Sequence, residues 1–145
     1  MIEKIIHKNK IFALIVRGRY RNKKGITFFT NNKDIQQFGY MNHKKNHIIK
    51  PHVHKSQIRK LLYTSEVILI LKGILRVDFY NKTKKYLFSK ILKEKDIIML
   101  VHGAHGFKVI KNVQMLEIKQ GPYITKLDKV KFDEIDESKI KIKKN

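Results

Sequence analysis

Three histidines and one glutamate are placed where their side chains would converge on a metal ion. His52 and His54 lie two residues apart in an extended segment that follows Pro51, so both imidazoles project to the same face of the chain. Glu66 and His105 each alternate with apolar residues, which places both side chains on the apolar face of a predicted strand. Because a buried carboxylate is costly unless it is paired or bound to a metal, this pattern predicts a four-ligand site.

Three imidazoles and one carboxylate form a mixed nitrogen and oxygen shell that leaves coordination positions open. Such a shell suits one divalent metal ion, Mn, Fe, Co, Ni or Zn, and the ligand types alone do not distinguish among these. At an open position the metal would polarise a substrate carbonyl or activate a bound water. The expected cofactor is therefore one divalent metal, with His52, His54, Glu66 and His105 as its ligands.

Short runs rich in Ile, Val, Phe and Tyr, separated by Gly, Asn and Lys, are typical of β-strands. The predicted strands are residues 11–16, 26–30, 37–42, 47–54, 66–71, 74–80, 86–92, 97–101, 106–110 and 114–119. The runs 66–71 and 74–80 meet at Lys72 and Gly73, which predicts a tight hairpin with Gly73 at positive φ. Strands this short and closely spaced indicate an all-β sandwich or barrel, and no linker or repeat divides the chain.

The segment that carries the first three proposed ligands resembles the first motif of the cupin superfamily, Gly-x5-His-x-His-x3–4-Glu-x6-Gly. Here His52 and His54 supply the histidine pair, and Glu66 and Gly73 keep the six-residue spacing. Eleven residues separate His54 from Glu66, so an insertion must loop out there. Asn46, which tolerates the left-handed conformation, stands where the motif has its opening glycine.

The resemblance covers about residues 37–120, and the second cupin motif matches only through His105. It implies a single-domain, cupin-type jelly-roll β-barrel, also called a double-stranded β-helix, over residues 1–125, with a peripheral lysine-rich segment at 126–145. It also implies a metal-binding protein that acts on a sugar, a sugar phosphate or a similar small polar metabolite, as an isomerase. Because cupins commonly dimerise through an N-terminal strand, the apolar run 11–16 predicts a homodimer.

Six polar residues near the expected mouth of the barrel are the substrate-binding candidates. The stretch 115–123 resembles the terminal strand of cupins found among surface-polysaccharide biosynthesis genes, and Glu117 and Lys119 share a face in it. Arg59 lies in the insertion between the ligands, where a guanidinium would bind a phosphate or carboxylate through two hydrogen bonds. For Arg59 the alternative is that the insertion is a structural cover with its charges in solvent, and for the other five it is a solvated rim without substrate contacts. The full set is Arg59, Arg76, Glu117, Lys119, Gln120 and Tyr123.

The sequence is strongly basic, with 33 Lys and Arg against 12 Asp and Glu in 145 residues and a formal net charge of +21. Basic charge attracts nucleic acids and anionic metabolites alike. Only five of the basic residues are arginines, and Lys, Ile and Asn share A/T-rich codons, so genome composition explains most of the excess. We therefore expect no specific nucleic-acid site, with the basic cluster 17–24 as one alternative site for anions.

The composition excludes several other classes of protein. The chain has no cysteine, which removes disulfide frameworks, thiolate zinc sites and cysteine nucleophiles. No apolar run approaches the roughly 20 residues of a membrane-spanning helix, and the N-terminus lacks the apolar core of a secretory signal. We expect a cytoplasmic protein with no membrane partner that acts on a small polar or anionic metabolite. The alternatives are a non-catalytic cupin that binds a small molecule or metal, and a basic nucleic-acid-binding β-barrel.

Overall fold

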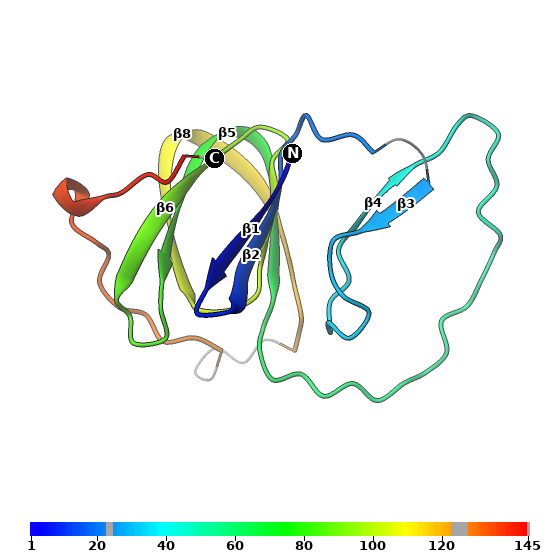
Figure 1. Cartoon of the computed structure of the whole chain (residues 1–145), viewed down its shortest axis with the longest axis horizontal. Helices are drawn as coiled ribbons and strands as arrows, with labels where there is room; N and C mark the ends of the chain where they lie inside the picture. Colours follow the sequence, from blue (N-terminus) through cyan, green and yellow to red (C-terminus); the bar gives the residue numbers. More distant parts are fainter. Residues whose placement is uncertain (23–24, 123–127, 145) are drawn as a thin grey trace.

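Eight β-strands account for most of the regular structure in this computed structural model, which describes residues 1–22, 25–122 and 128–144 (Figure 1). The strands are β1 (Ile2–His7), β2 (Lys10–Val16), β3 (Gly25–Phe28), β4 (Gly39–Asn42), β5 (Glu66–Tyr80), β6 (Tyr86–Lys93), β7 (Ile97–Leu100) and β8 (Ala104–Lys119). A three-residue 3-10 turn, η1 (Glu137–Lys139), is the one helical element in these ranges. The all-β class predicted from the sequence is confirmed. The described residues contain no helix with the length and apolar character needed to cross a membrane.

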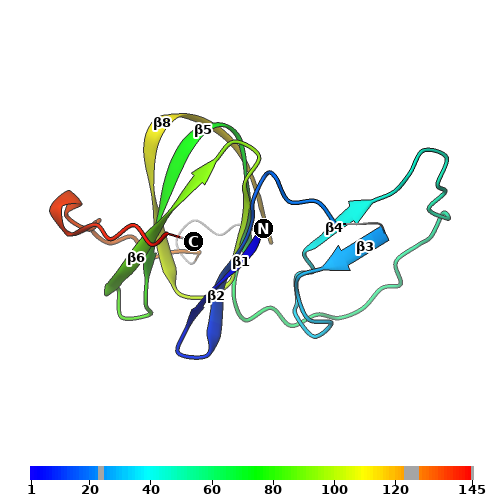
Figure 2. The ribbon, with the colours of Figure 1, turned by 45° about the horizontal axis from the view of Figure 1, so that its top comes forward.

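A six-stranded antiparallel sheet curls into a half-barrel (Figure 2). Its strand order is β1-β2-β7-β5-β6, and β8 pairs with the opposite edge of β5. The first four residues of β5 pair with β7 and the last seven with β6, so different strands extend the sheet from the two halves of β5. β8 follows β5 along nearly its whole length. β3 and β4 form a separate two-stranded hairpin.

The long ribbon of β5 and β8 bends at Gly73. Gly73 has a φ of +92°, and the register of β5 against β8 shifts between Ile70 and Leu75, as it does at β-bulges. A Cβ at Gly73 would overlap the carbonyl oxygen of Asn112 on β8, so the two backbones approach too closely for a side chain. The prediction of a hairpin at Lys72 and Gly73 is wrong. Because β8 pairs with residues on both sides of the glycine, the chain bends there without reversing.

Alternate residues of β5 on both sides of the bend belong to one hydrophobic core. The core cluster comprises Ile5, Phe12, Ala13, Ile15, Ile68, Ile70, Leu75, Val77, Phe79, Leu92, Ile98 and Leu100. The burial of this apolar surface is the dominant favourable term in folding. Since Ile68 and Phe79 come from opposite halves of β5 and share this core, the bend is a condition for closing it.

A network of four buried charges ties β1 and β2 to β6 and to the turn after it. Arg17 donates to Glu3 and, at 2.7 Å, to Asp96, while Lys90 donates to Glu3 at 2.8 Å. Burial alone would raise the pKa of Glu3, but the hydrogen bonds from Arg17 and Lys90 hold that pKa below its usual value. Arg17 therefore has structural partners rather than a place in the anion patch considered for residues 17–24, of which residues 23–24 lie outside the described ranges.

Strand pairing explains the remaining differences from the sequence prediction. Residues 47–54, predicted as a strand, belong to an irregular, exposed segment between β4 and β5 (Figure 1). The sequence does not predict β1, and the strands predicted at 106–110 and 114–119 are parts of one strand, β8. Residues 11–16, expected to mediate a homodimer, lie in β2, whose two edges pair with β1 and β7. Homodimerisation stays a prediction, but neither edge of β2 is free to mediate it.

Among the described residues, β8 pairs with β5 alone, which leaves its other edge unpaired. Apolar side chains of β8 remain on the surface, including Val109, Leu116 and Ile118, each more than half exposed. Lysines at 108 and 111 alternate with them along the strand. The open side of the half-barrel is therefore an apolar strand interrupted by positive charges.

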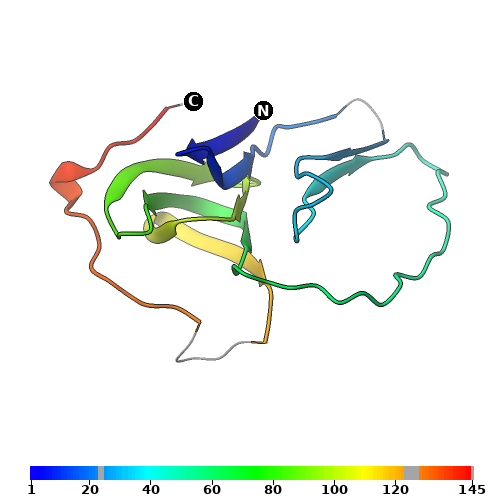
Figure 3. The same cartoon turned by 60° about the horizontal axis from the view of Figure 1, so that its bottom comes forward.

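Residues 128–144, called the C-terminal segment below, run along the outside of the sheet and pair with the edge of β6 at Ser89 (Figure 3). Ser89 of β6 donates its backbone N–H to the carbonyl of Lys141 and accepts one from Lys143, both at 2.9 Å. The Tyr80 hydroxyl accepts a hydrogen bond from the backbone nitrogen of Ile135 at 3.2 Å. Side chains of the segment add the ion pairs of Glu137 with Arg76 and of Asp128 with Lys119.

Gly73→Ala is expected to lower the free energy of unfolding by more than about 3 kcal/mol, because overlap with Asn112 adds to the strain of a positive φ. Gly25→Ala is the matched control, since Gly25 also has a positive φ, +82°, but open space where its Cβ would stand. The control should cost only about 1–2 kcal/mol. Urea unfolding followed by circular dichroism measures both. Equal losses would show that the close approach at Gly73 constrains nothing.

Candidate functional site

Glu66 and His105, two of the four predicted metal ligands, contact each other directly. Glu66 is the first residue of β5, whereas His105 opposes Phe79 near the other end of the same strand. Because β5 bends at Gly73, these ends meet, and His105 Nε2 lies 2.9 Å from Glu66 Oε2. The side chains of Glu66 and His105 are 15% and 29% exposed. The contact is therefore sheltered but still accessible to a small molecule.

The surroundings of Glu66 favour its ionised form. The hydrogen bond from His105 lowers the pKa of Glu66 against the effect of burial, and the positive charge of Lys119 lowers it further. Lys119 is close because it opposes Glu66 in the ladder between β5 and β8. When Nε2 of a neutral His105 donates to this carboxylate, Nδ1 keeps its lone pair. Nδ1 is then available as a general base.

His52 and His54, the other two predicted ligands, lie in the irregular segment between β4 and β5. Their rings contact each other with 5.2 Å between centroids, and His52 Nδ1 lies 2.9 Å from the carbonyl oxygen of Lys50. Within residues 1–22, 25–122 and 128–144, no three metal-ligating side chains come close enough to hold a metal ion. The structure pairs Glu66 with His105 and His52 with His54, but it does not join the pairs into one ligand set. Metal binding stays a prediction.

A cavity of about 900 Å³, called the loop cavity below, gathers several substrate-binding candidates. His54 and Arg59 line it from the irregular segment, and Lys119 and Gln120 line it from the end of β8. The Gln120 side chain is held in place because its oxygen accepts a hydrogen bond from the backbone nitrogen of Ser65 at 2.8 Å. A guanidinium, an ammonium and an imidazole around one cavity provide an environment that suits an anionic metabolite.

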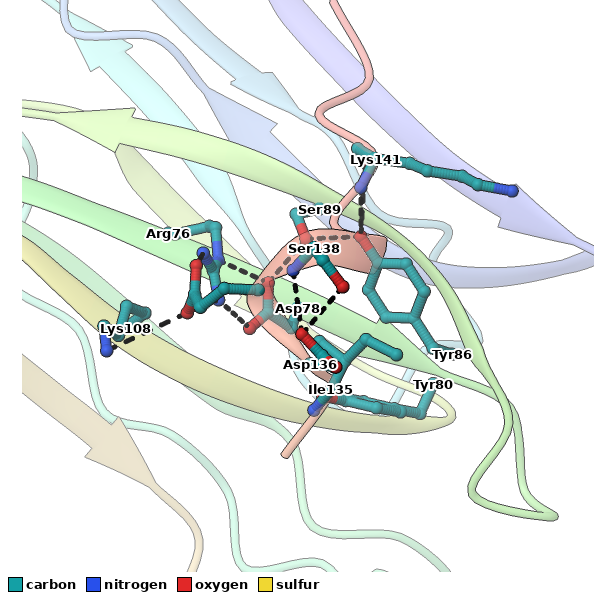
Figure 4. A network of polar contacts seen from close by, with 11 residues as sticks. Arg76, Asp78, Tyr80, Tyr86, Ser89, Lys108, Ile135, Asp136, Ser138 and Lys141 are labelled. Carbon is teal, nitrogen blue, oxygen red and sulfur yellow. Dashed lines mark hydrogen bonds and ion pairs between the residues drawn. The ribbon is translucent and has the colours of Figure 1, made fainter. Parts of the chain in front are cut away.

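Arg76 lies on the face of β5 opposite the core, beneath the C-terminal segment (Figure 4). It is buried and donates two hydrogen bonds to Glu137, at 2.6 and 2.9 Å. These bonds, with those to Asp78, raise the pKa of Arg76 above its usual value. A second cavity, of about 770 Å³, is called the C-terminal cavity below, and both Arg76 and His105 line it. The ring of His105, which opposes Phe79 and contacts Glu66, points to the inner side of the sheet, so the Glu66 pair and the Arg76 guanidinium lie on opposite faces.

Two predicted candidates take no part in either cavity as described. Glu117 is exposed on β8, opposite Ile68, and Tyr123 lies outside the described residues. The sequence reasoning in turn missed Glu137, which contacts Arg76 across 61 residues of chain. A signal was present, since four of the 12 acidic residues of this basic chain fall within residues 133–137.

Comparison of the chain with protein-family models, with curated protein sequences and with solved structures finds no match. The functional argument therefore rests on the side chains of this protein. Its two foundations are the contact between Glu66 and His105 and the mainly cationic lining of the loop cavity.

Glu66→Gln is expected to remove a pH-dependent part of the stability. Because folding lowers the pKa of Glu66, the ionised group stabilises the fold above its unfolded pKa of 4.5, and this contribution is lost as the pH falls through the folded pKa. Near neutral pH the free energy of unfolding of the variant should be about 1 kcal/mol lower than that of the wild type. The loss is small because the pair is partly exposed. The two proteins should converge at acid pH.

Urea unfolding across the acid range measures this difference. Glu117→Gln is the control, because Glu117 is exposed on the neighbouring strand, and it should change stability by no more than about 0.5 kcal/mol. A gap between wild type and Glu66→Gln that stays constant down to the lowest pH would contradict the assignment.

Proposed function

We propose that the protein is a cupin-type jelly-roll barrel that acts as an isomerase on a sugar, a sugar phosphate or a similar small polar metabolite. The observation that carries this proposal is the contact between Glu66 and His105. Support for the jelly-roll assignment comes from the curled antiparallel sheet, with both residues reaching its inner side from opposite ends of one bent strand.

In the proposed reaction His105 is the general base. Its Nδ1 takes a proton from the carbon next to a substrate carbonyl and returns it to the carbonyl carbon, while a hydroxyl proton moves to the former carbonyl oxygen. Atoms and charge balance without a co-reactant. Glu66 keeps the proton of the free ring on Nε2 and stabilises the imidazolium that forms, as a carboxylate partner does for catalytic histidines. Such proton transfer contributes about 10²–10⁴-fold to a rate.

The cations around the pair supply substrate binding. Lys119, the cross-strand neighbour of Glu66, lines the loop cavity together with Arg59, whereas Arg76 lies on the other face of β5. An anionic group on the substrate would therefore find positive charge beside Glu66. The same lining favours the alternative function, a non-catalytic cupin that binds such a metabolite without converting it.

His105→Gln is expected to lower isomerisation by at least about 10²-fold while leaving the fold intact, because it removes the base. The readout is solvent deuterium incorporated into sugar phosphates, measured by proton NMR. His102→Gln is the matched control, since His102 lies three residues earlier and its Nδ1 contacts the carbonyl of Val101. Full exchange in His105→Gln would refute the acid–base role. Ligand binding without any exchange in the wild type would favour the non-catalytic alternative.

The predicted metal site is tested separately. If His52, His54, Glu66 and His105 bind a divalent metal, protein purified without an affinity tag and dialysed against Mn²⁺ or Zn²⁺ should hold about one equivalent, and His54→Ala should lose most of it. His43→Ala is the control, because His43 belongs to no proposed ligand position. Much less than one equivalent in the wild type, or unchanged metal in His54→Ala, would reject this ligand set.

A further inference from the structure

Arg76 is a buried cation with two unequal anionic partners. Asp78, on the same strand, accepts from Nε at 2.8 Å and from Nη2 at 3.1 Å, and it is itself buried. Asp78 is fixed from the other side by the hydroxyl of Ser89 on β6 (Figure 4). The strands of the sheet therefore neutralise the guanidinium by themselves, through a pair that belongs to the fold.

Glu137 is the second partner, and it comes from outside the sheet. Its carboxylate accepts from Nη1 at 2.6 Å and from Nη2 at 2.9 Å, so it occupies the outer edge of the guanidinium in a two-bond arrangement. The Lys108 ammonium of β8 lies 3.8 Å from the same carboxylate. The Glu137 side chain is 60% exposed, whereas that of Arg76 is 6% exposed. Arg76 is therefore buried in the protein, whereas Glu137 lies mostly in solvent.

The element that carries Glu137 contributes nothing to the core. It is the three-residue turn η1, which buries none of its residues. The flanking chain is held by backbone hydrogen bonds at Ser89, by the hydroxyls of Tyr80 and Tyr86 and by the contact of the Phe132 and Tyr80 rings. Moving Glu137 into water would change its hydration little, because the carboxylate is already mostly hydrated. Asp78 would keep Arg76 paired.

The position that Glu137 fills has the chemistry of an anion site. A guanidinium edge presents two parallel N–H donors that match a carboxylate or phosphate, and a neighbouring ammonium adds charge. The C-terminal cavity of about 770 Å³ lies at this position, which is enough space for a small metabolite. Asp133, Glu134 and Asp136 also line it, so Arg76 and Lys108 form a local cationic site in a mostly acidic cavity.

We propose that Arg76 and Lys108 form an anion-binding site that Glu137 occupies in the free protein as an internal substitute, and that the carboxylate or phosphate of a small metabolite displaces it. Binding is then a competition between a tethered anion and a free one, and the effective concentration of the tethered group sets the apparent affinity. The inference goes beyond the proposed function, because the site lies on the face of β5 opposite the His105 ring. The binding competition is therefore separate from any turnover.

The test measures anion binding at Arg76 itself. The Nε–Hε signal of Arg76 in ¹⁵N-labelled protein is titrated with inorganic phosphate and, in a second arm, with acetate, which distinguishes the two anion classes. Glu137→Gln keeps the size of the side chain but removes its charge, so it should bind at least one of the anions about tenfold more tightly than the wild type. Arg76→Lys combined with Glu137→Gln should lose that gain, because the two-donor edge is gone.

Glu134→Gln is the matched control, since it removes the same charge from a residue that lines the same cavity but makes no hydrogen bond to Arg76. It should change the affinity by no more than about twofold, the general effect of one negative charge at a distance. Equal gains in Glu134→Gln and Glu137→Gln, or no gain in Glu137→Gln for either anion, would overturn the proposal. In the wild type, saturating anion should shift the Glu137 amide together with Arg76 Nε, and an unmoved Glu137 amide would also overturn it.

Failure of this proposal and failure of the proposed function are distinguishable. Tighter anion binding in Glu137→Gln without deuterium exchange on any sugar phosphate leaves the anion site in place and removes the isomerase. Exchange that depends on His105 without any effect of Glu137 does the reverse.

Discussion

The close approach of two backbones at Gly73 is the constraint on which the rest of the structure depends. It lets one 15-residue strand contribute both halves to a single core, and it brings the first residue of β5 to a residue of β8 that opposes the far end of β5. Without the bend, Glu66 and His105 would lie at opposite ends of an extended ribbon roughly 45 Å long. The contact between Glu66 and His105 thus results from the bend of β5. The chemistry proposed for this contact therefore depends on Gly73, which has no side chain.

The two arginines with paired carboxylates show how burial separates a structural ion pair from a binding group. Both acidic partners of Arg17 are slightly more buried than the arginine, and Lys90 completes a network of two acids and two bases. None of these four side chains is exposed enough for an anion from solvent to replace its partner. Arg76 has one buried partner and one exposed partner, so half of its environment is replaceable. In a chain of net charge +21, the positions of the few acidic residues therefore show which cationic side chains are held in ion pairs.

Alternation within single strands was enough to predict the all-β class and to place Glu66 and His105 on the apolar face, where the structure has them in contact. Pairing between distant strands was not predictable in the same way. Lys72 and Gly73 have the local character of a hairpin, and only the partner strand β8 decides that the chain bends instead. The contact of Arg76 with Glu137 spans 61 residues and leaves no periodic pattern in the sequence, apart from a cluster of acids in a basic chain.

The abundant lysines affect what can pair with the edge of β8 that has no partner strand among the described residues. A long strand with exposed apolar side chains and free backbone groups is a template on which another copy of the chain would add, as in fibrous aggregates. Lysines at 108 and 111 place ammonium groups beside that edge, so two copies that approach edge to edge meet like charges before their backbones can pair. This repulsion weakens as salt screens it. The colloidal stability of the protein should accordingly decline with rising ionic strength, the opposite of the salting-in expected for a chain near its isoelectric point.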